Sequence, residues 1–191
     1  FKLDKMPKIH IVDRYLETVK HLGVKNDNQG LDFFLSANDK MDISIFPKNY
    51  IVFIIGGQHA TKILPNEKIM SIIKKVNRPV LLVGGLEDFE RGEQIIANTN
   101  NTINTCGKYS ILQSASLVQQ ATMVITHDTG MMHIAAAFNK KIYSVWGNTV
   151  PEFGMYPYLE SKQSKRIEVK GLNCRPCSKI GYDKCPKGHF R

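Results

Sequence analysis

The sequence lacks the features that mark membrane and secreted proteins. None of its apolar runs approaches the roughly 20 residues that a membrane-spanning helix needs. The first ten residues, FKLDKMPKIH, hold neither an initiator methionine nor a basic segment followed by an apolar one. We therefore expect no secretory signal and a chain that begins inside a longer protein. With 191 residues, 42% of them hydrophobic and 23% charged, one soluble domain with appendages is the expectation.

Motifs of nucleotide and hydrolase chemistry are also missing. Neither G-x-G-x-x-G nor G-x-x-x-x-G-K-[ST] follows the first apolar run, which disfavours a standard dinucleotide fold and a nucleoside-triphosphate P-loop. The stretch GGQHA is no G-x-S-x-G nucleophile elbow, so hydrolase chemistry is unsupported. Binding of a sugar nucleotide is compatible with these absences.

Cysteine is scarce, but three of the four cysteines cluster near the C-terminus. Without a secretory signal, reduced thiols in the cytoplasm are the expectation. The spacing C-x2-C-x7-C-x3-H has the type and number of ligands of a structural zinc site. Free thiols and a disulfide are the alternatives. The candidate metal ligands are Cys174, Cys177, Cys185 and His189.

The net charge of +9 favours anionic partners such as phosphates and anionic lipid headgroups. Basic residues are dispersed along the chain up to the C-terminal tail, and no nucleic-acid-binding motif is recognisable. We expect no nucleic acid among the partners.

The N-terminal part reads as a helix and a linker. Residues 8–22 carry apolar side chains at helical spacing, and Gly23 suits the end of that helix. The next stretch is rich in Asn, Asp and Gly, which is typical of a connecting loop. We predict that residues 1–45 belong to a connection from a preceding domain.

From residue 50 to 147, short apolar runs alternate with helical patterns. Strands are predicted in 50–57, 78–85, 101–107, 122–128 and 140–147, and helices in 65–76, 89–99, 110–121 and 130–138. This alternation is typical of βαβ units and of a parallel sheet covered on both faces. The sequence predicts a doubly wound, Rossmann-like α/β domain over 46–160. A basic, cysteine-containing tail, 161–191, should run over the surface with room for one helix.

Chemically useful residues follow the predicted strands, where open parallel sheets bind ligands. The loop GGQHATKILP offers the Thr61 hydroxyl and the Lys62 cation to a phosphate, although a plain turn with a solvated lysine fits as well. In GGLEDFERG, Glu87 could accept hydrogen bonds from ribose or sugar hydroxyls, while Asp88 fits the N-cap of a helix.

The stretch THDTGMMHIAAAF places four such residues at a strand end and the helix that follows. Asp128 ends the strand, and Thr129 and Gly130 begin a helix whose unpaired N–H groups attract an anion. His133 shares the side of the first turn with Gly130. A diphosphate fits there, with Asp128 facing hydroxyls or a cation. A capped helix with a satisfied histidine is the alternative.

These motifs resemble those of glycosyltransferase family 9, the lipopolysaccharide heptosyltransferase family. HDTGMMHIAAAFNKKIYSVWGNTVPE looks like its D-[TS]-G-x-x-H-x-A-A-A segment followed by an apolar strand and a G-x-T-x-P turn, and GGQHATKILP is similar to its donor-phosphate loop. GGLEDFERG matches loosely, and the paired methionines after Gly130 leave the shape of the sugar pocket open. The resemblance covers residues 8 to 191.

The resemblance implies the GT-B fold, of which this chain looks like the C-terminal, donor-binding half. The donor would be a nucleotide sugar of the ADP-heptose type. The acceptor would be a nascent lipopolysaccharide core at the inner face of the cytoplasmic membrane, with peripheral membrane contact. The implied donor-binding residues are Thr61 and Lys62 at the diphosphate, Glu87 at the ribose, and Asp128, Thr129, Gly130 and His133 at the diphosphate and sugar.

The implied reaction is an inverting transfer that requires no metal or other cofactor. Lys62, the helix N-terminus and His133 would stabilise the leaving diphosphate. The general base would be an aspartate of the preceding domain, so this segment should hold no catalytic residue. We expect the chain alone to bind nucleotide weakly and to transfer no sugar.

Two other functions remain open from the sequence. One is a non-catalytic nucleotide-binding or interaction module with a zinc-bearing tail, and the other is a GT-B-type sugar-nucleotide epimerase. A preceding domain with an acidic residue at the interdomain cleft would favour the transferase over the module. Turnover of a sugar nucleotide without any acceptor would indicate the epimerase.

Overall fold

A parallel sheet forms the centre of the molecule. The computed structural model describes residues 7–178 and 180–189; residues 1–6, 179 and 190–191, which fall in the predicted N-terminal and C-terminal segments, lie outside the described residues. Within the described part, six parallel strands pair in the order β3-β2-β1-β4-β5-β6. They are β1 (Ile51–Ile54), β2 (Val80–Val83), β3 (Thr102–Asn104), β4 (Val124–His127), β5 (Ile142–Trp146) and β6 (Lys165–Glu168). This order is that of doubly wound nucleotide-binding sheets, so the predicted fold class is confirmed.

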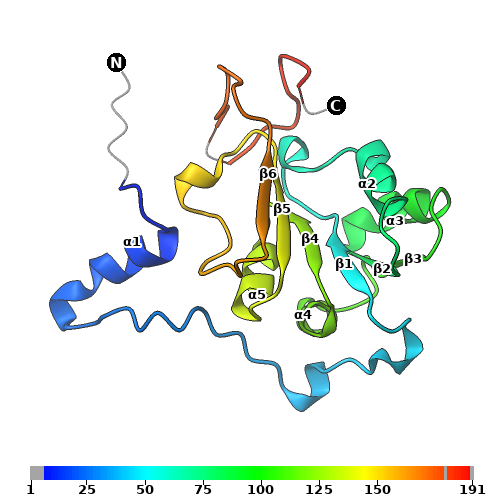
Figure 1. Ribbon diagram of the computed structural model, residues 1–191, viewed down its shortest axis with the longest axis horizontal. Helices are drawn as coiled ribbons and strands as arrows, with labels where there is room; N and C mark the ends of the chain where they lie inside the picture. Colours follow the sequence, from blue (N-terminus) through cyan, green and yellow to red (C-terminus); the bar gives the residue numbers. More distant parts are fainter. Residues whose placement is uncertain (1–6, 179, 190–191) are drawn as a thin grey trace.

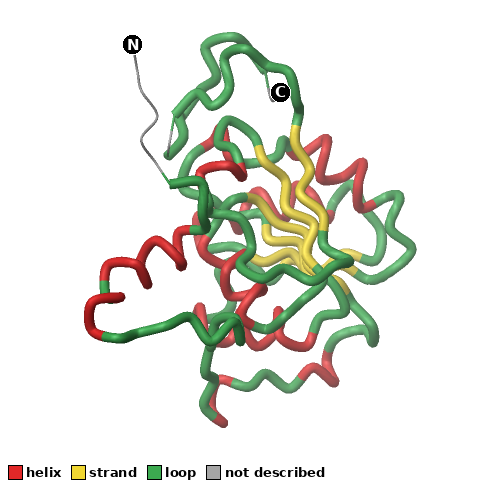
Figure 2. Tube along the Cα trace, turned by 60° about the vertical axis from the view of Figure 1, so that its left-hand side comes forward, coloured by secondary structure: helices red, strands yellow, loops and turns green. Residues whose placement is uncertain are grey.

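Helices cover both faces of the sheet (Figures 1 and 2). On one face lie α2 (Asn66–Ile73) and α3 (Phe89–Ile96), and on the other lie α4 (Ile111–Gln120) and α5 (Gly130–Ala137). Because successive side chains of a strand point to opposite faces, β1 serves both cores. Val52 and Ile54 pack on the side of α4 and α5, while Ile51 and Phe53 pack on the side of α2 and α3. Burial on both faces explains why the strand sequences are continuous apolar runs.

The sheet has one strand more than the five that the sequence predicts. β6, with the sequence KRIE, pairs in parallel with β5, so that Tyr143 lies beside Lys165 and Trp146 beside Glu168. β6 pairs with β5 on one side, and three of its four residues are exposed. An edge strand of this kind needs no apolar run. The prediction that this part of the tail merely runs over the surface was therefore wrong.

The N-terminal segment lies beside the sheet. The predicted helix of 8–22 consists of α1 (Ile11–Thr18) and a 3₁₀ turn, Lys20–Leu22, and Gly23 ends it in the left-handed region, with φ 80°, as expected. No residue from Ile11 to Thr18 is buried. The chain then runs extended beneath the sheet (Figure 1), where the Phe33 ring contacts the Phe138 ring edge-on. Near its end Met41, Ile43 and Phe46 pack against the core below α4 and α5.

The strand order reverses between β1 and β4. The chain leaves β1 toward α2 on one face and leaves β4 toward α5 on the other. The carboxyl ends of these two strands therefore flank a crevice, the position at which doubly wound sheets bind ligands. No helix in residues 7–178 and 180–189 is long and apolar enough to cross a membrane.

Candidate functional site

An ion pair joins the loops that follow β1 and β4. Lys62 ends a 3₁₀ turn, Ala60–Lys62, and its Nζ lies 2.7 Å from Oδ2 of Asp128. The two side chains are 15% and 8% exposed. The same carboxylate oxygen accepts a hydrogen bond of 2.9 Å from the Thr149 hydroxyl, which comes from the loop after β5. Three neighbouring strand ends are thus tied together, and the cation that faces Asp128 comes from the protein itself.

The N-terminus of α5 is open to an anion. Thr129 holds the N-cap position with an extended backbone, but its side chain makes no capping bond. Its hydroxyl oxygen is buried and has no hydrogen-bond partner within the described residues. A Cβ added at Gly130 would meet nothing within 4 Å. Free space, an unused hydroxyl and the unpaired N–H groups of a first helical turn coincide at this point.

His133 lies one turn along α5 and faces a polar cavity of about 290 Å³. Burial lowers the pKa of His133 below its usual value; the Asp128 carboxylate opposes this shift, and nearby His10 and Lys62 reinforce it. The imidazole is therefore neutral near pH 7 and can donate one hydrogen bond. The lining of this cavity is Gln58, His59, Lys62, Asp128, Thr129, Gly130, His133 and Ile180.

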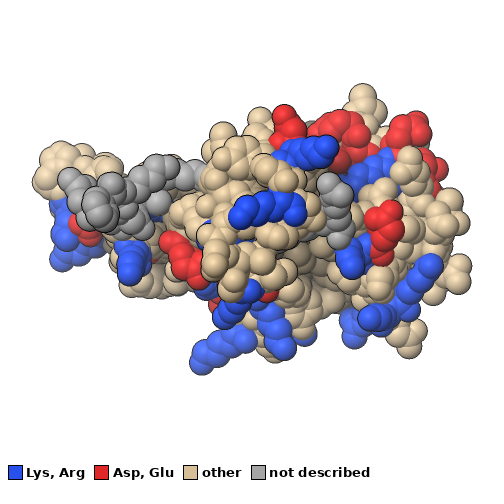
Figure 3. Space-filling model, turned by 90° about the horizontal axis from the view of Figure 1, so that it is seen from above, with Lys and Arg blue, Asp and Glu red and all other residues tan. Residues whose placement is uncertain are grey.

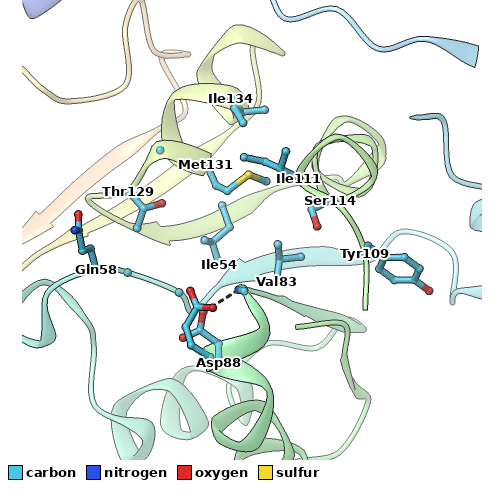
Figure 4. A pocket seen from close by; sticks show the side chains of 16 residues that line it. Ile54, Gln58, Val83, Asp88, Tyr109, Ile111, Ser114, Thr129, Met131 and Ile134 are labelled. Atoms are coloured by element: carbon cyan, nitrogen blue, oxygen red, sulfur yellow. Dashed lines mark hydrogen bonds between the residues drawn. The ribbon is translucent and has the colours of Figure 1, made fainter. Parts of the chain in front are cut away.

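A second, larger cavity of about 520 Å³ shares Gln58, Thr129 and Gly130 with the first. Its wall is mostly apolar, with Ile54 and Val83 from the strands and Ile111, Met131 and Ile134 from α4 and α5, as Figure 4 shows. Tyr109, Ser114 and Glu87 add polar groups at its border. The two cavities thus meet at the start of α5.

The two adjacent acids after β2 have different surroundings. Glu87 is exposed and borders the larger cavity. Asp88 is buried, and its carboxylate accepts a hydrogen bond of 2.9 Å from the Gly85 backbone N–H (Figure 4). Burial raises the pKa of Asp88, and the neighbouring charge of Glu87 raises it further. Asp88 holds the turn that precedes α3, which leaves Glu87 as the acid available to a ligand.

Thr61 is placed differently from the other predicted site residues. Its hydroxyl donates a hydrogen bond to the Tyr182 carbonyl and accepts one from the Tyr182 N–H, both at 2.7 Å. Thr61 is 6% exposed and lines neither of the two adjoining cavities. The other six predicted donor-binding residues each line one or both of these cavities: Lys62, Glu87, Asp128, Thr129, Gly130 and His133.

Two further residues hold the loop after β1, and the sequence reasoning missed both. His127, fully buried at the end of β4, accepts a hydrogen bond of 2.9 Å at Nε2 from the Leu64 N–H. Burial and the Arg91 charge lower the pKa of His127 to about 3. Arg91 donates to the carbonyls of Leu64 and Ile55 at 2.5 and 2.7 Å. A histidine inside the apolar run of β4 was the available signal for His127; Arg91 gave none.

The four candidate metal ligands of the tail gather only in part. Cys174 Sγ lies 3.4 Å from His189 Nδ1. Burial and the adjacent thiols of Cys174 and Cys185 raise the pKa of Cys177. In residues 7–178 and 180–189, no group of three or more His, Cys, Asp or Glu side chains is arranged to hold a metal ion. All four cysteines of the chain are free thiols in this structure, so the disulfide alternative is not realised here.

The carboxyl edge of the sheet is the side seen from above in Figure 3. There, among the described residues, Lys and Arg side chains are interspersed with Asp and Glu over the surface.

Comparison with known proteins gives the same picture of the fold. The sequence matches the profile of glycosyltransferase family 9 (heptosyltransferase) over residues 1–184. It is 33% identical over 109 residues to lipooligosaccharide heptosyltransferase 2 of Haemophilus influenzae, a match that covers 53% of this chain and 31% of that protein.

Among solved structures, a family 9 glycosyltransferase from Veillonella parvula superposes with a TM-score of 0.74 at 21% identity, covering 88% of this chain and 51% of the other. The Escherichia coli ADP-heptose lipopolysaccharide heptosyltransferase II gives 0.71 at 22%, covering 92% and 61%. The chain therefore spans about a third of the curated relative and half to three fifths of these structures. Its fold is confirmed as one half of a GT-B glycosyltransferase.

Proposed function

Because the chain belongs to glycosyltransferase family 9, we propose that it is the donor-binding domain of an inverting glycosyltransferase. The donor is a nucleotide sugar of the ADP-heptose type, and the acceptor is a lipopolysaccharide core bound mainly by the preceding domain. That domain supplies the general base, and contact with the inner face of the cytoplasmic membrane is peripheral. The donor and the acceptor are supported by the relatives, which are heptosyltransferases of lipopolysaccharide or lipooligosaccharide.

The observation that carries the proposal is the pair of cavities that meet at the start of α5. A nucleotide sugar has an aromatic base with apolar faces and a ribose at one end, a charged diphosphate in the middle and a polar sugar at the other. The larger, mostly apolar cavity suits the nucleoside, with Glu87 beside the ribose. The junction at Thr129 and Gly130 suits the diphosphate, and the polar cavity with His133 suits the sugar.

The reaction needs stabilisation of the negative charge that develops on the diphosphate as its bond to the sugar breaks. Three groups can supply it: the N–H groups at the start of α5, the ammonium of Lys62 and a hydrogen bond from neutral His133. The ion pair with Asp128 fixes the Lys62 ammonium, which keeps protons free for phosphate oxygens. Groups held in place in this way need no reorganisation during the reaction.

Calorimetric titration of the chain with ADP, UDP, GDP and their sugars tests the proposal. We expect ADP and its sugar to bind, weakly because half of the cleft is absent, and we expect no sugar transfer. Lys62→Ala should weaken the binding of the diphosphates much more than the binding of the nucleosides. If none of these nucleotides bound at millimolar concentration, the donor-site assignment would be wrong. Sugar transfer by this chain alone would contradict the assignment of the base to the preceding domain.

A structural zinc ion in the tail remains part of the proposal, and no other cofactor is required. Its support is the type of the four side chains and the distance of 3.4 Å between Cys174 Sγ and His189 Nδ1. Binding would require the four groups to draw together. Metal analysis of protein purified without a histidine tag tests this, and less than about a tenth of an equivalent of zinc would exclude the site.

A further inference from the structure

Residues 174–178 and 180–182, called the cysteine segment below, bond to the loops of the donor site. Thr61 and Tyr182 exchange three hydrogen bonds: the Thr61 N–H to the Tyr182 carbonyl at 3.0 Å, and the two through the Thr61 hydroxyl at 2.7 Å. Thr61 directly precedes Lys62 in the same 3₁₀ turn. The tail is therefore bonded one residue away from the cation of the site.

The cysteine segment also holds the loop after β5. The Arg175 guanidinium donates to the carbonyls of Gly147 and Thr149 at 2.6 and 2.7 Å, and the Cys177 N–H donates to the Asn148 carbonyl at 3.1 Å. Thr149 in turn donates its hydroxyl hydrogen bond to Asp128. One intermediary thus separates the segment from each partner of the Lys62–Asp128 ion pair.

The two loops that the segment holds lie in direct contact. The Asn148 N–H donates to the Thr61 carbonyl at 3.3 Å, and a Cβ at Gly147 would lie only 2.3 Å from that same carbonyl oxygen. On the other side, Ile180 forms part of the wall of the polar cavity beside His59. A displacement of the segment would therefore move this wall and both loops together.

We propose that the cysteine segment is a positioning element of the donor site and that Thr61 is a positioning residue, which acts through Tyr182 to set where Lys62 meets the diphosphate. This rests on the proposed donor-binding function. The Thr61 hydroxyl both donates and accepts. Replacing it by a methyl group keeps the shape of the side chain but leaves two backbone groups of Tyr182 with fewer partners. The ligand-binding role expected for the Thr61 hydroxyl is thereby replaced by an indirect one.

The test compares Thr61→Val with Thr61→Ser in the 191-residue chain, by titration with ADP and with AMP. We expect Thr61→Val to lower the affinity for ADP about tenfold and the affinity for AMP less than about threefold, because binding of the second phosphate depends on Lys62. Thr61→Ser restores the hydroxyl and should restore ADP binding. The matched control is Thr105→Val, because Thr105 is also buried and its hydroxyl donates to the Leu82 carbonyl, away from the tail.

A second measurement does not depend on the folding of a variant. Binding free energies couple reciprocally, so a diphosphate that orders the loops should also order the cysteine segment. In the unaltered chain freed of metal, saturating ADP should slow alkylation of Cys174 and Cys177 by at least about fivefold, and AMP should slow it less.

The outcomes separate the two proposals. If the unaltered chain binds ADP but Thr61→Val leaves the ratio of ADP to AMP affinity unchanged, the positioning role is wrong. The same follows if Thr105→Val lowers that ratio as much as Thr61→Val does, or if ADP does not protect the thiols. If the unaltered chain binds none of ADP, UDP and GDP, the proposed function itself is wrong.

Discussion

The two ends of the chain look alike in sequence but have different relations to the site. Both are polar segments without the alternation of the central domain, and both were expected to be appendages. The N-terminal segment, residues 7–36, bonds to the stretch 154–158, for example through the Ile11 N–H to the Gly154 carbonyl at 2.8 Å and through buried His10, whose Nε2 lies 2.7 Å from the Tyr156 carbonyl. The C-terminal tail instead supplies a strand of the sheet and bonds to the loop that carries Lys62 and to the loop of Thr149, whose hydroxyl bonds to Asp128. Composition therefore does not reveal whether a terminal segment belongs to a binding site.

Deleting the C-terminal tail and the N-terminal segment, each in a separate variant, tests this comparison most directly. A chain that stops after residue 169 loses Arg175 and Tyr182, which hold both loops, so we expect ADP affinity to fall by about two orders of magnitude. A chain that starts at Ala37 should keep ADP affinity within about threefold, since it retains the core contacts of Met41, Ile43 and Phe46. Calorimetry measures both affinities, and circular dichroism checks that both chains fold. Equal losses in the two chains would contradict the comparison.

Breaking the Lys62–Asp128 ion pair should give the next largest effect on stability and ADP affinity. Lys62→Ala leaves the largely buried Asp128 carboxylate without its cation, which we expect to cost about 3 kcal/mol of stability. It should also remove most of the contribution of the second phosphate to ADP binding. The double variant Lys62→Ala with Asp128→Asn should recover stability but not ADP affinity. Urea unfolding and titration separate the two effects, and recovery of affinity in the double variant would mean that Lys62 serves stability alone.

A variant of His127 tests how β4 holds the loop after β1, because His127 Nε2 accepts the hydrogen bond of the Leu64 N–H. Its pKa is about 3 in the folded chain and near 6.5 in the unfolded chain, so below pH 6.5 the unfolded state binds a proton that the folded state does not. Stability should fall by about 1.4 kcal/mol per pH unit between pH 6 and pH 4 from this residue. His127→Gln, which can still accept from Leu64, should lose that slope. Urea unfolding at pH 7, 6 and 5 measures it; an unchanged slope in His127→Gln would refute the assignment.

The smallest effect is expected where the N-terminal segment approaches the site. His10 contributes to lowering the pKa of His133, but burial is the larger cause, so His10→Gln should change ADP affinity by less than about twofold. His133→Asn should weaken ADP binding about three- to tenfold, the net value of one ordinary hydrogen bond. Because an added diphosphate favours protonated His133, ADP affinity of the unaltered chain should rise as the pH falls below 7. Titration with ADP at pH 7.5 and 6.5 measures this rise in affinity. An equal rise in His133→Asn would mean that another group causes the pH dependence.

Much of the site follows from local patterns in the sequence. The residues at the carboxyl ends of β1, β2 and β4 could be predicted because parallel strands end at one edge and helices begin there. Asp128, Thr129, Gly130 and His133 lie on one short stretch, so their proximity needs no long-range information. Their roles as ligands of a donor stay predictions, but their convergence on the two cavities is observed.

Other features depend on contacts between distant residues, which no local pattern specifies. Thr61 and Tyr182 are 121 positions apart, and a hydroxyl after a strand has the same appearance in sequence whether it faces a ligand or a backbone. The same holds for Arg91, whose partners Ile55 and Leu64 lie in another loop. β6 escaped prediction because an exposed edge strand carries little hydrophobic signal.

The sequence by itself determined the doubly wound fold and the family, because buried strands and helices impose their periodicity on the residues and a ligand-facing helix start imposes its own short motif. The tertiary structure decided that Asp128 is paired with Lys62, that the Thr61 hydroxyl is taken by Tyr182, and that the cysteine segment belongs to the donor loops. The physical reason is that a hydrogen bond or ion pair is specified by which groups meet in space. Only the folded chain brings the loops after β1 and β5 against the tail.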